Sequence, residues 1–138
     1  MAKMPADGTK IEIDGTTAGA PDIEVTGVKS FSGFDGERPE IDNTDLSSEA
    51  SEFFLGKRDW GSFSLDWFIN YGDPGQNEVR AAELSGALKT VKITFPDLTT
   101  ATFKAYVKNA TSLSGGISGM LEGSAALRIT GKPSFAKP

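Results

Sequence analysis

The chain has 138 residues and a formal net charge of −5, and it contains neither cysteine nor histidine. These counts exclude disulfides, thiolate chemistry and the usual imidazole base or transition-metal ligand. An acidic chain also lacks the positive charge that holds DNA phosphates, and no apolar run is long enough for a membrane helix. The length suits one domain, 1–138, and the 16 glycines favour a loop-rich β domain.

The first third of the chain predicts two strands. Lys10–Asp14 alternates, with Ile11 and Ile13 on one face. Residues 22–31 form a second strand whose alternation slips at Gly27, the residue type expected at a bulge. We predict a flexible arm over residues 1–9 and a turn over residues 15–21.

A long stretch with little periodicity, residues 32–61, is predicted to be a loop between early strands. Within it, residues 47–54 have the composition for two helical turns. The loop also carries apolar side chains that need burial, either against the open end of their own domain or against another copy of the protein. They are Ile41, Leu46, Phe53, Phe54, Leu55 and Trp60.

The clearest strand follows this loop. Alternation places Phe63, Leu65 and Trp67 on one face, and it places Ser62, Ser64 and Asp66 on the opposite, polar face.

A helix is predicted over residues 74–85. Asp73 is a good N-cap, Pro74 suits the first position, Gln76 fits a capping box and Gly86 provides a stop. Three further strands, 90–95, 101–109 and 120–130, alternate around a flexible glycine-rich segment at 112–119, and residues 131–138 are predicted to be a flexible tail. Their inward positions are Val91, Ile93, Phe95, Ala101, Phe103, Ala105, Val107, Leu121, Ala125, Leu127 and Ile129. The pattern predicts a mainly β protein, an antiparallel sandwich or barrel with one flanking helix.

The sequence offers little for catalysis or ligand binding. Serines and lysines occur without a motif joining a nucleophile to a base. Asp66 is the one acid on a strong strand, and we interpret it as a solvated or interface residue. The acids at 35, 37, 42 and 45 lack the glycine and the distal glutamate of a calcium loop. We therefore predict a protein that is not an enzyme and has no cofactor and no metal site.

Residues 40–67 resemble the tail tube proteins of long-tailed, lambda-like bacteriophages, and the resemblance extends over about residues 10–135. It is carried by an ordered set in the long loop: an acid, a threonine, a Leu-Ser pair, an aromatic pair, a glycine, a second acid and a glycine that opens the next strand. These are Asp42, Thr44, Leu46, Ser47, Phe53, Phe54, Gly56, Asp59 and Gly61.

The resemblance implies a structural virion protein whose hexameric rings stack into a hollow tube for DNA ejection. Its implied partners are further copies of itself, tail tip or initiator proteins, terminator proteins and a tape measure protein, with DNA passing without specific binding. With no signal peptide at the N-terminus, assembly is expected in the bacterial cytoplasm. We predict lumen positions at Ser62, Ser64 and Asp66. The expected subunit contacts are Asp42, Thr44, Leu46, Phe53, Phe54, Leu55 and Trp60.

An alternative function remains at this point. The chain could be a self-contained β-sandwich module that binds a sugar or a protein through residues 32–61.

Overall fold

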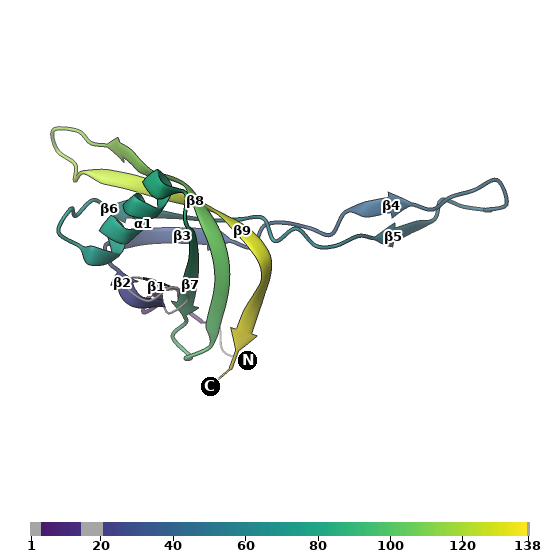
Figure 1. Ribbon diagram of the computed structural model, residues 1–138, viewed down its shortest axis with the longest axis horizontal. Helices are drawn as coiled ribbons and strands as arrows, with labels where there is room; N and C mark the ends of the chain where they lie inside the picture. Colours follow the sequence, from purple (N-terminus) through teal and green to yellow (C-terminus); the bar gives the residue numbers. More distant parts are fainter. Residues whose placement is uncertain (1–3, 15–20, 138) are drawn as a thin grey trace.

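The computed structural model of the protein describes residues 4–14 and 21–137 (Figure 1). In that part of the chain the fold consists of one helix and nine strands. They are β1 (Lys10–Asp14), β2 (Pro21–Val25), β3 (Val28–Gly33), β4 (Glu40–Asp42), β5 (Phe53–Leu55), β6 (Ser62–Phe68), α1 (Pro74–Ser85), β7 (Leu88–Thr94), β8 (Thr100–Ser114) and β9 (Glu122–Ala136). The predicted turn at 15–21 lies mostly outside the described residues.

Seven strands form one antiparallel sheet in the order β2-β1-β7-β8-β9-β6-β3. The 15-residue strands β8 and β9 curve strongly (Figure 1). The first part of β8 pairs with β7, and the first part of β9 pairs with β6. Register shifts along the β8–β9 ladder allow this bend, so one sheet folds into two facing layers. This confirms the predicted antiparallel β fold with one helix.

The core lies between the two layers. Trp67 and Phe63 from β6 are 0% and 1% exposed, and they meet Ile13, Ile93 and Leu127 from the other strands. The predicted inward positions on β7, β8 and β9 are buried or packed on this core, with one exception. Leu121 precedes β9 and is 45% exposed, so its predicted burial is wrong.

Helix α1 begins and ends where the sequence predicts. The Asp73 carboxylate accepts a hydrogen bond from the Gln76 amide, and Gly86 ends the helix at a φ of 72°. The Gln76 side chain does not complete a capping box. It is fully buried, and its amide group instead donates to the carbonyls of Thr26 and Phe68 at 2.7 and 2.9 Å. It thereby ties the helix to the turn between β2 and β3.

Replacing Gln76 by leucine is expected to lower the free energy of unfolding by about 2–4 kcal/mol, because the variant leaves several nearly buried backbone groups without a hydrogen-bond partner. Besides the two carbonyls, the amide of Asn70 loses the Gln76 Oε1 acceptor at 3.0 Å. Urea unfolding measures the change. The neighbouring Asn77→Leu is the control, since Asn77 is exposed and should cost much less. Equal losses in the two variants would contradict this role of Gln76.

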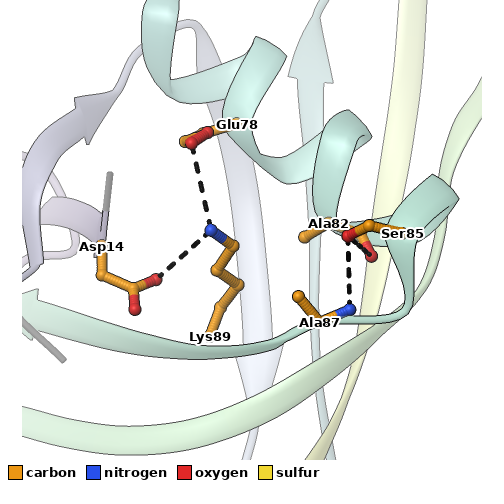
Figure 2. A network of polar contacts seen from close by, with 6 residues as sticks. All are labelled: Asp14, Glu78, Ala82, Ser85, Ala87 and Lys89. Carbon is orange, nitrogen blue, oxygen red and sulfur yellow. Dashed lines mark hydrogen bonds and ion pairs between the residues drawn. The ribbon is translucent and has the colours of Figure 1, made fainter. Parts of the chain in front are cut away.

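The opposite side of α1 is tied to the sheet by a cluster of charges (Figure 2). Lys89 Nζ lies 4.0 Å from Asp14 Oδ1 on β1 and 3.9 Å from Glu78 Oε1 on α1. At the end of the helix, the Ser85 hydroxyl accepts a hydrogen bond from the Ala87 amide at 3.3 Å. The chain turns directly into β7, so Leu88 belongs to this strand and does not extend the helix.

Three further predictions need correction. Residues 22–31 are not one bulged strand: Gly27, with φ of 78°, separates β2 at one edge of the sheet from β3 at the other. Residues 131–136 are not a flexible tail, because β9 continues to Ala136 through pairing with Thr100 on β8. The segment 47–54 contains no helical turn, and its last two residues lie in β5.

Candidate functional site

The predicted loop at 32–61 is largely an extended hairpin arm. Strands β4 and β5 pair with each other outside the main sheet, and they project away from the body (Figure 1). Phe53, Phe54 and Leu55 are 55%, 51% and 53% exposed, and Leu46 at the distal turn is fully exposed. An apolar surface of this kind on a thin projection has no core of its own, and it is typical of an interaction site.

The distal turn of the arm is held by its own side chains. The Asp42 carboxylate accepts from the Thr44 amide at 2.8 Å, and the Thr44 hydroxyl accepts from the Glu52 amide at 2.7 Å. Asp45 accepts from the amide and the hydroxyl of Ser47. Hydrogen bonds from Thr44 and Ser47 lower the pKa values of Asp42 and Asp45, so both carboxylates are ionised at neutral pH. The turn at the tip is therefore held in one conformation by these hydrogen bonds, and it is negatively charged.

The base of the arm is packed closely. A Cβ on Gly36 would lie 2.0 Å from the carbonyl oxygen of Asp59, so only glycine fits where the outgoing and returning segments of the arm meet. The Arg58 guanidinium lies 3.9 Å from the Trp60 ring centroid, and it donates to the carbonyl oxygen of Gly36 at 3.2 Å. The Asp35 carboxylate accepts from the Ser62 amide at 2.9 Å. These contacts fix the direction in which the arm leaves the body.

The structure separates the two alternatives for the apolar side chains of this segment. Trp60 packs on its own domain, where it contacts Phe34 and Phe135. The predicted contact residues on the arm are all exposed to solvent in the single chain. They are Asp42, Thr44, Leu46, Phe53, Phe54 and Leu55.

The outer face of β3, β6 and β9 is lined with small side chains. Ser64 and Asp66 are exposed there, as the alternation predicts, while Ser62 is half-buried. Cross-strand hydrogen bonds connect the row: Ser30 donates to Asp66 at 3.1 Å, and the hydroxyls of Ser32 and Ser64 lie 3.1 Å apart. The next strand places Ser124 opposite Asp66 and Ala126 opposite Ser64. The result is a smooth, polar surface.

Two basic side chains border this face, and each is paired with a carboxylate. Lys29 on β3 forms an ion pair with Glu122 on β9, and it lies 5.2 Å from the Phe68 ring centroid. Arg128 on β9 forms an ion pair with Asp59. The Gly61 amide and Arg128 both donate hydrogen bonds to Asp59 and lower its pKa. These pairs reduce the positive charge that the face presents.

Sequence reasoning found only one strand of this face. Ser30 and Ser32 were obscured by the supposed slip at Gly27, although both lie on one parity of β3. Ser124 and Ala126 share a parity that the alternation of residues 120–130 already contains. The ion-pair partners Glu122 and Asp59 could not be found, because pairing depends on strand register.

The described residues do not assemble a metal centre: 4–14 and 21–137 contain no group of three His, Cys, Asp or Glu side chains suited to an ion. Within these ranges, α1 is also too short and too polar to cross a lipid bilayer.

These features define an antiparallel β fold with a projecting hairpin arm and a polar sheet face. No protein-family model matches the sequence, and no curated protein matches it.

Solved structures match nearly the whole chain. A chain in the tail of an empty gene transfer agent particle with C6 symmetry has a TM-score of 0.78 and 17% identity, covering 97% of this chain and 99% of that chain. A chain of the SPP1 tail tube has a TM-score of 0.74 and 17% identity, covering 97% and 80%. A chain of an extracellular contractile injection system, in its sheath/tube terminator structure, has a TM-score of 0.72 and 14% identity, covering 99% and 98%. The protein therefore has the fold found in these tail and injection structures.

Proposed function

We propose that the protein is a structural, non-catalytic subunit of a tail tube, which forms hexameric rings that stack into a hollow conduit for DNA. The observation that carries the proposal is the end-to-end fold match with a chain of a tail with C6 symmetry, which covers 97% of this chain and 99% of the other. A match of that extent includes the projecting arm as well as the sheet.

The arm supports self-assembly. Its exposed phenylalanines and leucines lack a core within the chain, so a neighbouring subunit in the same or the next ring is proposed to bury them. The sheet edges lead to the same proposal, because among the described residues β2 and β3 each pair with one strand and leave backbone groups unpaired on the other side. A ring of subunits would bury the apolar side chains of the arm and pair the edges of the sheet.

The outer face of β3, β6 and β9 is proposed to line the lumen. Short serine and alanine side chains present few groups that could hold a passing duplex, and Asp66 repels phosphate. Lys29 and Arg128 are held in ion pairs, which leaves little positive charge for counterion release. Ser62, at the border of this face, is proposed to contribute with Ser64 and Asp66.

The proposed location is the tail of a virion or related particle, after assembly in the bacterial host cytoplasm. Solved structures with this fold are described as a tail, a tube terminator, a tube-terminating cap and a baseplate. By analogy, tip or initiator, terminator and tape measure proteins are the proposed partners.

Negative-stain microscopy of the purified protein tests the proposal. We expect dispersed single chains when dilute, and rings or tubes of uniform diameter when the protein is concentrated or seeded with a tail-tip complex. A chain that stays monomeric at millimolar concentration with an initiator present would contradict the proposal and would favour the self-contained binding module.

A further inference from the structure

Charge is divided along the hairpin arm. The distal part, residues 40–56, contains five acidic residues and no lysine or arginine. Three basic residues, Arg38, Lys57 and Arg58, flank this part, together with three acidic ones, Asp35, Glu37 and Asp59. The arm therefore has an acidic tip, while its base carries charges of both signs. The acidic residues of the tip are Glu40, Asp42, Asp45, Glu49 and Glu52.

A groove lies beside the base of the arm, where β9 passes. Four basic side chains line it: Arg38, Lys57, Arg58 and Lys132. The groove's one lining carboxylate among the described residues, Asp59, is already paired with Arg128.

Among the described residues, no unpaired carboxylate lines the groove itself, and Glu37 and Glu40 line the neighbouring hollow with Arg38 and Lys57. Arg38 donates to the carbonyl oxygen of Gly56 at 2.9 Å, and Arg58 donates to the carbonyl oxygens of Phe34 and Gly36. Backbone carbonyls position a guanidinium group without cancelling its charge. Across residues 4–14 and 21–137, none of the four basic side chains takes part in an ion pair.

The tip of an arm does not reach the groove at its own base. Strands β4 and β5 pair between the two regions, with Glu40 opposite Leu55 and Asp42 opposite Phe53, and they keep the tip extended away from the body (Figure 1). At physiological ionic strength, charges interact strongly only within about 8 Å. The charges of the acidic tip and of the basic groove in one chain can therefore both be neutralised only by other molecules.

We propose that the basic groove at the arm base binds the acidic arm tip of a second copy of this chain. The contact is heterologous, since it joins two different surfaces, and repetition extends it into an open-ended array. Complementary charge orients the incoming subunit and speeds its association, while the exposed phenylalanines supply apolar contact area. This inference deepens the proposed self-assembly and rests on it.

Two charge variants test the contact. E49K/E52K changes the charge of residues 40–56 from −5 to −1, and K57E/K132E changes that of the four basic lining residues from +4 to 0. These four side chains make no hydrogen bond or ion pair inside the described chain, so the fold should persist in both variants. Each variant alone should lose tube growth by roughly tenfold or more, because the attraction between tip and groove is then lost. An equimolar mixture should form pairs of the two chains that do not extend into tubes, since only the acidic tip of K57E/K132E and the basic groove of E49K/E52K remain complementary. Sedimentation and negative-stain microscopy measure both results.

The control K92E/K104E makes the same change in net charge on the outer face of β7 and β8, and it should assemble like the unmodified chain. Assembly failure in this control would overturn the inference, and so would tube growth by K57E/K132E alone. In either case, tubes formed by the unmodified chain would still support the proposed function. Pairing of the two chains in the mixture supports the inference, and the absence of pairing overturns it. A duplex DNA bound by the unmodified chain but not by K57E/K132E, with assembly unaffected, would assign the groove to nucleic acid and overturn it as well. If the unmodified chain forms no tubes, the proposed function itself fails.

Discussion

Replacing Phe53 and Phe54 together by alanine is expected to stop tube growth while leaving the fold of the single chain intact. Both rings are about half exposed on β5 and lie outside the core. Aromatic side chains buried at the centre of an interface contribute about 2 kcal/mol or more each to association. Growth requires this contact at every added subunit, so the loss should appear as the absence of polymer at concentrations where the unmodified chain assembles.

Thermal unfolding separates the two contributions of these side chains. F53A/F54A should keep the melting transition of the unmodified chain, whereas Phe63→Ala in the core should cost about 3–5 kcal/mol of stability. Leu84→Ala with Leu98→Ala is the matched surface control, since both leucines are exposed and lie far from the arm in the sequence. Loss of the thermal transition in F53A/F54A would place the pair in the subunit core and contradict its assignment to the arm.

Local signals made the helix predictable. Asp73, Pro74 and Gly86 act on the backbone within a few residues of themselves, so their spacing set the limits of α1 before any tertiary contact was known. The hydrogen bonds of Gln76 could not be read in this way. One of its partners, the carbonyl of Thr26, lies 50 residues away.

Strand ends were less predictable than strand cores. Alternation alone predicts the face of the sheet on which Phe63, Leu65 and Trp67 lie. The second half of β9 contains Gly131, Lys132 and Pro133, which have low strand propensity, and it stays extended because it pairs with β8.

The arm posed a different problem. Its paired strands span only three residues each, from Glu40 to Asp42 and from Phe53 to Leu55, and three residues carry too little periodicity for a prediction. The exposure of its apolar side chains was also open, because the sequence cannot tell whether such a segment folds onto its own domain. The outcome differs along the segment. Trp60, close to β6, packs on the core, whereas Leu46 and residues 53–55 on the arm are exposed.

Replacing Asp66 by lysine is expected to slow DNA passage through assembled tubes. Asp66 is exposed on the proposed lumen face between Ser30 and Ser124, and the neighbouring carboxylate of Glu122 is already paired with Lys29. The cross-strand neighbours of a lysine here are the hydroxyls of Ser30 and Ser124, and Glu122 is held by Lys29, so the new charge would be free to bind phosphate. Particles built with the variant should form normal tails and release their DNA more slowly. For the dilute purified chain, the slope of log affinity for a short duplex against log salt should steepen by about 0.9 for each new phosphate contact.

The control for this change is Asp97→Lys, which alters net charge equally at an exposed position in the turn between β7 and β8, outside the proposed lumen face. It should leave both DNA release and the salt dependence as they are in the unmodified protein, because the added charge lies away from the path of the duplex. Asp66→Asn should fall between the unmodified chain and the lysine variant, since it removes repulsion without adding attraction. If normal tails with lysine at position 66 eject DNA at an unchanged rate, this face lies outside the lumen. It would then belong to the outer wall of the tube.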